Sequence, residues 1–493
     1  MLKTKASLLL SFIMALALVL GLSTIASASI TTGISGTVKN IDTGVAISGA
    51  TISDGTHTAT SDTSGNYSLN EVAGNYTLKI SASGYLTTTQ ISTVVSGTVK
   101  TVNWSLTKSY GTQTPPAYAQ NMKYTVLAWN DLGMHCDQND YSYFSVLPPY
   151  NTLHVQVSGR PDLVTSGITV SYNFPKKTNS AANTNFWQYA PKYGWNVAAN
   201  TGITGTKLSG DMKLDANGKS FVATGIPITP YDDDGTWDPY GAANITVKDS
   251  NGSVVQTASV VAPVSTEMNC QNCHGTTNPQ LDILQKHDSH NGTTLVADHN
   301  NGIVHQCNEC HADNALGAPG KTGVESLSLA MHNFHKDKMT TTTIAANTTP
   351  TCYNCHPGTN TQCLRGIMEK AGKTCIDCHG DMNKVASSQQ AGRQAWLQEP
   401  KCADCHDSLH QENANTLYRN SIMNNSVAGD MNGKFYCESC HNSEHAIFVT
   451  SNPADATIPQ KFQGDNYWIW NCKVCHQENY TQSNFHGSGS GGD

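Results

Sequence analysis

Short runs in which apolar and polar residues alternate, the pattern of half-buried strands, occupy the first half of the chain and then stop. In the first region these runs lie at residues 34–38, 50–52, 67–69, 76–80 and 99–106. Turn sequences rich in Asp, Asn and Gly separate them roughly every ten residues, which is typical of a sandwich or barrel. We therefore predict a small all-β sandwich over residues 31–108.

A second region with a similar pattern covers residues 122–265. Its strands are predicted at residues 124–129, 153–157, 168–174, 222–226 and 245–247. Few residues between them repeat with a helical period, so we predict a second β-rich domain. Residues 109–121 contain Thr114-Pro115-Pro116 with Gly and Gln, and we interpret them as a linker between the two domains.

Five short phrases of the first region carry a family resemblance. They are Ser35-Gly36-Thr37-Val38, Ile47-Ser48-Gly49-Ala50-Thr51-Ile52, Gly65-Asn66-Tyr67-Ser68-Leu69, Gly74-Asn75-Tyr76-Thr77-Leu78 and Gly84-Tyr85. They resemble the carboxypeptidase regulatory-like domains, which implies a Greek-key sandwich of about seven strands. The resemblance also implies a spacer, adhesion or docking role without chemistry of its own. Because nothing around His57 converges on a metal, we interpret that residue as an ordinary surface histidine.

After residue 265 the pattern gives way to a fixed motif, Cys-x-x-Cys-His, which occurs seven times. Its cysteine pairs are Cys270 and Cys273, Cys307 and Cys310, Cys352 and Cys355, Cys375 and Cys378, Cys402 and Cys405, Cys437 and Cys440, and Cys472 and Cys475. The histidines that follow them are His274, His311, His356, His379, His406, His441 and His476. Two thiols at this spacing can form thioethers to haem, and the adjacent imidazole can bind its iron. Because roughly 0.02 copies would arise by chance, the motif predicts seven covalently bound haem c groups.

Zinc sites and disulfides are the alternatives for so many cysteines. Paired Cys-x-x-Cys knuckles with nearby histidines form tetrahedral zinc sites, but they do not require His directly after the second Cys. All seven copies have that histidine. A disulfide framework gives no reason for one fixed motif to recur. Haem attachment is therefore the stronger interpretation.

The spacing of the motifs predicts the architecture of residues 266–486. Successive first cysteines are 37, 45, 23, 27, 35 and 35 residues apart. About thirty residues per haem bury too little surface for a separate core around each one. We therefore predict a cytochrome domain in which closely packed haems form the core, surrounded by short helices and mostly irregular loops. Residues 487–493 are interpreted as a flexible Gly/Ser tail.

Each iron needs a second axial ligand, and this segment holds nine further histidines. The distal candidates are His287, His290, His299, His305, His332, His335, His410, His445 and His486. The pairs His287/His290 and His332/His335 would each lie on one helix face, where the two rings could serve different haems. His410 and His445 each follow a motif histidine by four residues, and each should bind the iron of a neighbouring haem. Bis-histidine ligation throughout favours electron transfer over catalysis, because it leaves no open iron position.

Several residues outside the motifs are weaker candidates. His135 and His154 would have to reach across from the second β-rich domain, and Met331, Met339, Met368 and Met382 could each replace a distal histidine. The two remaining cysteines, Cys136 and Cys363, predict a disulfide between the second domain and the haem segment. Residues 231–238 have the oxygen-rich composition of a Ca2+ loop but lack the ligand pattern of an EF-hand. A plain solvated turn is the alternative to calcium there.

The N-terminus predicts export. Lys3 and Lys5 precede an apolar run over residues 8–22, and Ala26-Ser27-Ala28 follows as a cleavage site, so residues 1–28 are predicted to be a signal peptide. This run is too short for a spanning helix, and no other stretch approaches the necessary length. The formal charge of −8 becomes −10 without the two lysines. Such an acidic protein is expected to avoid nucleic acid and anionic membranes and to favour basic redox partners or metal substrates.

A second resemblance concerns the chain as a whole. The phrase Trp129-Asn130-Asp131-Leu132-Gly133-Met134-His135-Cys136 is similar to the segment that precedes the haem domain in large exported cytochromes of metal-reducing bacteria. With the motifs, it makes the chain similar to the multihaem c-type cytochromes of extracellular electron transfer. That resemblance implies a periplasmic or cell-surface electron carrier whose partners are other cytochromes or a metal oxide surface.

Two alternatives to a soluble electron carrier remain open. One is a catalytic multihaem reductase of nitrite, hydroxylamine or a sulfur oxyanion, which would need one open haem. The other is a self-assembling subunit of a structural cytochrome filament. The sequence leaves open whether the protein is an enzyme.

Overall fold

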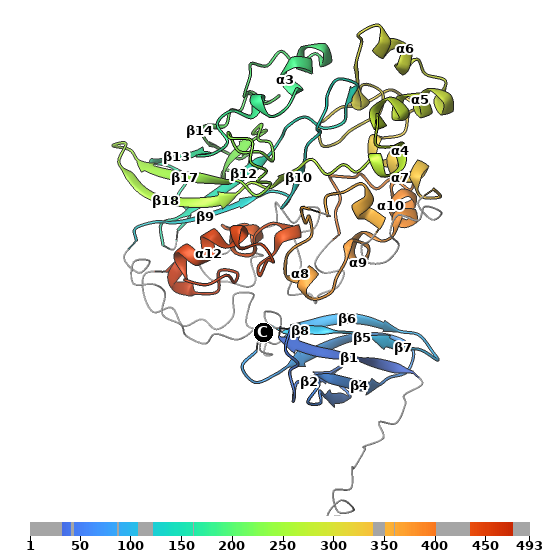
Figure 1. Cartoon of the computed structure of the whole chain (residues 1–493). Coiled ribbons are helices and arrows are strands. Elements are labelled where there is room, and N and C mark those ends of the chain that lie inside the picture. The colour runs from blue at the N-terminus through green and yellow to red at the C-terminus, as the bar shows by residue number, and fades with distance from the viewer. Residues whose placement is uncertain are drawn as a thin grey trace, which may run out of the picture.

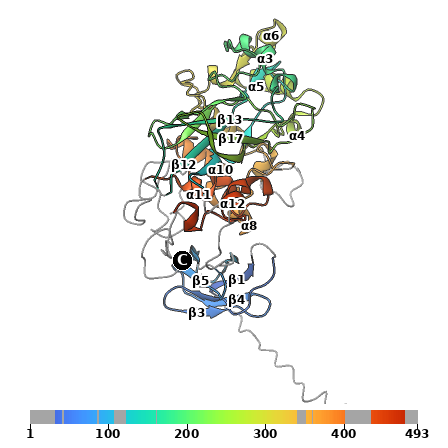
Figure 2. The same cartoon turned by 90° about the vertical axis from the view of Figure 1, so that its left-hand side faces the viewer.

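The computed structural model describes residues 32–40, 44–85, 88–106, 122–160, 162–338, 351–358, 360–400 and 434–476. Within these ranges the chain forms two β-domains and a segment of short helices and long loops (Figures 1 and 2). The predicted signal peptide, linker and tail, at residues 1–28, 109–121 and 487–493, lie outside the described residues.

The N-terminal domain contains two sheets, which confirms the predicted sandwich. Its strands are β1 (Gly33–Asn40), β2 (Thr51–Ser53), β3 (Thr58–Thr60), β4 (Asn66–Asn70), β5 (Gly74–Ser81), β6 (Thr88–Val94), β7 (Val99–Thr101) and β8 (Trp104–Leu106). One sheet has the order β4-β1-β7, with β8 also paired to β1, and the other has the order β3-β2-β5-β6. Because β7 and β8 pair in parallel with successive parts of β1, they form one broken edge strand.

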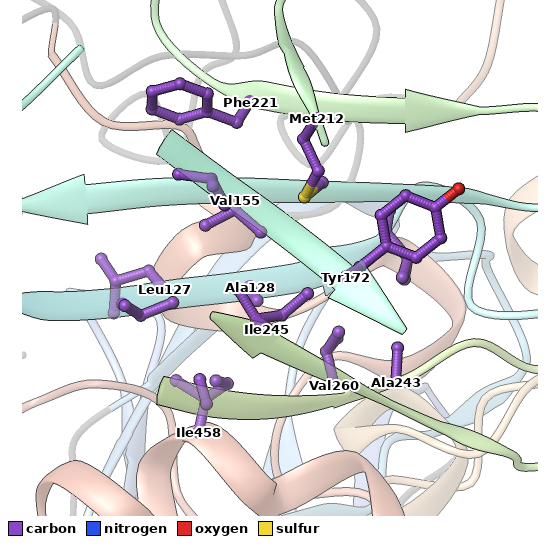
Figure 3. Packing of buried hydrophobic residues seen from close by; sticks show 14 of the residues in the cluster. Leu127, Ala128, Val155, Tyr172, Met212, Phe221, Ala243, Ile245, Val260 and Ile458 are labelled. Carbon is purple, nitrogen blue, oxygen red and sulfur yellow. The ribbon is translucent and has the colours of Figure 1, made fainter. Parts of the chain in front are cut away.

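The second β-domain also contains two four-stranded sheets. Their orders are β15 (Lys213–Leu214), β16 (Phe221–Thr224), β12 (Thr152–Ser158), β9 (Thr125–Asn130), and β14 (Ser209–Asp211), β13 (Ile168–Asn173), β17 (Ala242–Asp249), β18 (Val254–Val261). Buried residues such as Leu127, Val155, Ile245 and Val260 pack together in the core of the domain (Figure 3). All five strands predicted for this region are present. The domain also contains the short helices η1 (Ser180–Ala182), α3 (Phe186–Tyr189) and η2 (Ala190–Tyr193).

The motif-bearing segment consists of short helices joined by long loops. Its helices are α4 (Gln271–His274), α5 (Pro279–Asn291), α6 (Leu295–Asn300), η3 (Cys307–Glu309), α7 (Leu327–His335), η4 (Thr351–Asn354), α8 (Ile367–Lys370), α9 (Cys375–His379), α10 (Met382–Gln390), α11 (Cys437–His441), η9 (Glu444–Ala446), η10 (Pro453–Ala456), α12 (Thr457–Phe462) and η11 (Cys472–Val474). The short parallel pair of β11 (Phe144–Ser145) with β20 (His305–Gln306) connects it to the second domain. A similar pair, β10 (His135–Cys136) with β19 (Val264–Ser265), lies within the second domain, just before the motif-bearing segment begins. In the described ranges we find no helix whose length and apolar character would let it cross a bilayer.

The end of the motif-bearing segment completes the core of the second β-domain. Phe435, Ile458 and Phe462 belong to the same buried cluster as the strands, and α12 lies against β9 and β18 (Figure 1). The Arg160 guanidinium adds a polar link by donating to the backbone carbonyl of His476 at 3.1 Å. The second domain therefore packs on the part of the chain that carries the last two motifs.

Candidate functional site

Six of the seven Cys-x-x-Cys-His motifs lie in the described part of the chain, each on a short helical turn. The turns are α4, η3, η4, α9, α11 and η11. In α9, for example, the Asp377 carboxylate accepts a hydrogen bond from the backbone N–H of Thr374 at 2.7 Å and fixes the first turn. A helical turn places residues three and four apart on one side, so both cysteines and the histidine of a motif face the same way. The motif Cys402, Cys405 and His406 lies outside the described residues.

Four motif histidines face a second histidine at a nearly constant distance. The ring centroids are 6.5 Å apart for His274 and His335, 6.3 Å for His311 and His287, 6.3 Å for His356 and His332, and 6.3 Å for His379 and His445. Two imidazoles bound to one metal ion from opposite sides have centroids about 6.4 Å apart, because the metal–nitrogen bond is about 2.0 Å and the nitrogen lies about 1.2 Å from the ring centre. The four pairs therefore fit the two axial ligands of a haem iron.

Six of these eight histidines have Nδ1 in a hydrogen bond, which leaves Nε2 for a metal. Backbone carbonyls lie 2.7 Å from Nδ1 of His332, 2.7 Å from that of His335, 2.8 Å from that of His311 and 2.9 Å from that of His445. For His274 the partner is the Asp282 carboxylate at 2.7 Å, and for His287 it is the Thr293 hydroxyl at 2.9 Å. Metal-binding histidines typically donate their second N–H in this way, which fixes the orientation of the ring.

The other two histidines of the four pairs are exposed as whole residues, although protein atoms surround and desolvate their imidazoles. This desolvation lowers the pKa of His356 to about 4, and the neighbouring His332 and His445 lower it further. Desolvation also lowers the pKa of His379 to about 4, with His445 as the next contribution. Since a neutral imidazole is the form that binds a metal, both rings are in the ligand form at neutral pH.

Two short elements bring histidines to more than one motif. On α7, His332 and His335 face histidines of two different motifs. His445 follows the motif histidine His441 by four residues but faces His379, which belongs to another motif. One short helix or turn can therefore serve two neighbouring sites.

Three of the motifs lie next to one another. The thiols of Cys352 and Cys375 share a hydrogen bond, which raises the pKa of Cys352. Burial raises the pKa of Cys355 to about 11, and the nearby Cys270 and Cys273 raise it further. The third motif therefore contacts the fourth and lies near the first.

Two distal candidates pack against aromatic rings. His290 lies edge-on to Phe334 with ring centroids 4.9 Å apart, and His299 stacks on Tyr143 at 4.3 Å. Neither contact brings the imidazole opposite a motif histidine. The candidates that lie outside the described residues are His410 and His486.

Two other histidines are held by carboxylates. The Nδ1 atom of His305 lies 2.9 Å from Glu309 and its Nε2 atom lies 3.3 Å from Asp298. The hydrogen bond to Glu309 is the main reason that the pKa of His305 is raised. The Nε2 atom of His135 lies 2.6 Å from Asp131. Both rings thus contact carboxylates within their own surroundings.

Two further histidines stack on tryptophans. The ring of His154 lies 5.4 Å from that of Trp129 with an interplanar angle of 11°. The motif histidine His441 lies 6.3 Å from Trp468 at 28°. His154 is therefore placed within the second β-domain, next to strand β9.

A compact group of potential metal ligands lies in the N-terminal sandwich. Among the described residues, the group of His, Cys, Asp or Glu ligands whose atoms all lie within 4.8 Å of one another is Asp54, His57 and Glu71, in the N-terminal sandwich. In these ranges no Cys-x-x-Cys-His motif gathers its side chains into such a group. His57 is exposed, as expected for a surface histidine, but the expectation that nothing converges on it was wrong, because the packing of the two sheets brings Glu71 next to it.

The two cysteines outside the motifs, Cys136 and Cys363, are free thiols, and they lie close enough for Cys136 to affect the pKa of Cys363. Burial raises the pKa of Cys136 to about 12 and that of Cys363 to about 12, and Cys136 contributes to the shift of Cys363. Such thiols stay protonated and unreactive at neutral pH. The disulfide between them remains a prediction.

The acidic loop at residues 231–238 directs its carboxylates to protein partners. Asp232 lies 3.2 Å from the buried Lys177 ammonium, and Asp233 accepts a hydrogen bond from the backbone N–H of Thr178 at 2.7 Å. These side chains therefore turn to different neighbours. Calcium binding at this loop remains a prediction.

Comparison with known proteins identifies the first domain. Residues 33–107 match the carboxypeptidase regulatory-like domain. The match agrees with the resemblance carried by the five short phrases of the first region, and it covers only the N-terminal sandwich. No curated protein matches the chain.

Solved structures resemble parts of the chain at low TM-scores. A type II cohesin–X-dockerin complex from Acetivibrio cellulolyticus is 25% identical, with a TM-score of 0.13, over 17% of this chain and 65% of that one. A DUF3823 family protein from Bacteroides ovatus is 14% identical, with a TM-score of 0.14, over 47% and 98%. The major pilin subunit of Bacillus cereus is 12% identical, with a TM-score of 0.14, over 47% and 68%. These scores are too low to relate the whole chains.

Proposed function

We propose that the chain is an exported heptahaem c-type cytochrome that passes electrons to a periplasmic or extracellular acceptor, such as a metal oxide or another cytochrome. The observation that carries this proposal is the set of four histidine pairs with ring centroids 6.3–6.5 Å apart. Each pair combines a motif histidine with one from elsewhere in the chain, which is the combination that bis-histidine haem ligation requires.

In such a cytochrome, the motif cysteines and the paired histidines would have different functions. The motif cysteines would hold haem c, which when bound supplies reversible one-electron chemistry. The paired imidazoles would bind the iron from both sides, so these four sites would disfavour catalysis that needs an exchangeable ligand. The acceptors at Nδ1 keep the rings oriented and increase their basicity.

The surroundings of the sites support an electron carrier. The contact between Cys352 and Cys375 places two motifs side by side, as transfer between neighbouring sites would need. The N-terminal sandwich would serve for positioning or adhesion, because its family match implies no chemistry of its own. The predicted export would bring the protein to the compartment where haem c is attached.

The proposal is tested on the full-length protein purified from a host that attaches haem c. Pyridine haemochrome counts the haem, and low-temperature EPR of the oxidised protein reports its spin state. We expect seven haems per chain, one for each motif, with the paired sites low-spin. Protein without covalent haem, or with zinc in its place, would overturn the proposal. A stoichiometric high-spin signal that shifts with nitrite or hydroxylamine would instead indicate a reductase.

A further inference from the structure

A group of potential metal ligands in the N-terminal sandwich has no part in the proposed electron transfer. Asp54 directly follows β2, His57 directly precedes β3, and Glu71 directly follows β4. Strands β2 and β3 belong to one sheet and β4 to the other. The three side chains therefore converge from both sheets of the sandwich.

The distances within this group fit an ion better than a direct ion pair. The Nδ1 atom of His57 lies 3.4 Å from Asp54 Oδ2 and 3.3 Å from Glu71 Oε1. A hydrogen bond between charged groups is normally about 2.7–2.9 Å long. In contrast, the ligand atoms around a tetrahedral zinc ion lie about 3.3 Å apart, because each bond to the metal is about 2.0–2.1 Å.

The burial of the two carboxylates points to a missing positive charge. The side chain of Glu71 is 2% exposed and that of Asp54 is 4% exposed. The Glu71 Oε1 atom is buried and accepts no hydrogen bond. Burial raises the pKa of Glu71, and the neighbouring Asp54 carboxylate raises it further. A cation held between the two groups would offset the cost of burying them.

The turn between β2 and β3 orients its ligands in advance. Asp54 Oδ1 accepts hydrogen bonds from the backbone N–H groups of Thr56 at 2.7 Å and His57 at 2.6 Å, which directs Oδ2 toward the imidazole. The hydroxyl of the neighbouring Tyr76 donates to the Val72 carbonyl at 3.0 Å. The His57 side chain is 57% exposed, so solvent can reach one side of the group and complete the coordination of an ion.

We propose that Asp54, His57 and Glu71 bind one divalent transition-metal ion of the zinc or manganese class. One imidazole nitrogen and two carboxylate oxygens suit these ions, whereas Mg2+ and Ca2+ are usually bound by oxygen ligands alone. The bound ion joins the β2–β3 turn to the end of β4 and so clips the two sheets together.

The test is equilibrium dialysis of the full-length, haem-loaded protein against micromolar Zn2+ at pH 7.5, followed by metal analysis. We expect His57→Gln and Glu71→Gln each to bind one equivalent of zinc less than the unsubstituted protein. Asp62→Asn is the control, because Asp62 caps a turn of the same domain through the N–H groups of Ser64 and Asn66. The equivalent lost in the two variants should also be lost from the unsubstituted protein at pH 5, because protons compete with a metal ion for histidine and carboxylate ligands.

Equal zinc content in all four proteins at pH 7.5 would overturn the site and leave an imidazole bridge between two carboxylates. His57→Gln changes an exposed side chain and should fold normally. If circular dichroism shows that Glu71→Gln is misfolded, the comparison between His57→Gln and the unsubstituted protein still decides the test. The haem content of each preparation is measured separately, so failure of the cytochrome proposal would be seen independently.

Discussion

The distal histidines allow a test at single-residue resolution. His332→Ala should convert one haem from low-spin to high-spin, because the partner of His356 is lost while the thioethers of that motif remain. The haem count should not change. Low-temperature EPR and pyridine haemochrome measure the two quantities.

His290→Ala is the matched control for this substitution. The His290 ring packs against Phe334 and does not face any motif histidine that the structure describes. Its loss should leave every low-spin signal in place. The ligand assignment fails if His332→Ala keeps all its low-spin haem, or if His290→Ala loses one equivalent.

A buried carboxyl group predicts a pH dependence of stability. Burial raises the pKa of Asp137 to about 7, so the folded protein binds this proton more tightly than the unfolded chain does. The contribution of Asp137 to the free energy of unfolding is therefore fully present below about pH 4 and is lost as the pH rises through about 7.

Asp137→Asn should remove this dependence. In the unsubstituted protein an Asp137 oxygen accepts hydrogen bonds from the Tyr141 hydroxyl at 2.6 Å and from the backbone N–H of Gln138 at 2.8 Å. The amide oxygen of asparagine can accept both. At pH 8 we expect the variant to be more stable by up to about 4 kcal/mol, and near pH 4 we expect no difference. Urea unfolding followed by tryptophan fluorescence at both pH values makes the comparison. A gap of the same size at both pH values would contradict the assignment.

At the residue scale, the sequence indicates the motif ligands but not their partners. Cys375, Cys378 and His379 are recognisable because their chemistry needs residues within one helical turn. Nothing local marks His445 as the partner of His379, because the two rings meet only when separate loops fold together. For the same reason, the sequence gives no local sign that Glu71 lies next to His57 in the folded domain.

At the scale of elements, α7 should respond to a change of register. Inserting one alanine between Asn333 and Phe334 rotates the rest of the helix by about 100°. His335 should then lose its alignment with His274, whereas His332 lies before the insertion and keeps its own. We expect one high-spin haem equivalent by EPR.

Asn333→Ala is the control for the insertion, because it changes the same turn without changing the register. It should keep all low-spin signals. If the insertion variant also keeps them, α7 does not supply the ligand of the first motif.

Whether a strand could be predicted from the sequence depended on how clearly apolar and polar residues alternate along it. β4 buries Tyr67 and Leu69 and exposes the residues between them, so its period of two is visible in the sequence. β3 and β6 consist largely of threonine, serine and glutamine and carry little apolar signal. Their hydrogen bonds to β2 and β5, formed in the folded sandwich, decide that they are strands.

At the scale of the whole molecule, the shared core predicts that the second domain and the last motifs unfold together. Phe462→Ala should lower the free energy of unfolding by about 3–5 kcal/mol, because this ring on α12 is 1% exposed in the cluster formed with the strands. Denaturation should be followed by tryptophan fluorescence and by haem absorbance. Both transitions should shift together.

Val254→Ala is the control for this substitution. Val254 lies at the start of β18 and is 57% exposed, so we expect a change within about 0.5 kcal/mol. A Phe462→Ala variant whose haem transition shifts while its fluorescence transition stays in place would contradict a shared core.

The sequence by itself determined the features that depend on residues close together in the chain. These are the alternation that forms the two β-domains and the motifs on single helical turns. Tertiary structure alone decided which distant imidazoles face one another, how Asp54, His57 and Glu71 meet, and that α12 completes the core of the second domain. The physical reason is that local spacing fixes the direction of a side chain along its own element, whereas its partner depends on how separate elements pack.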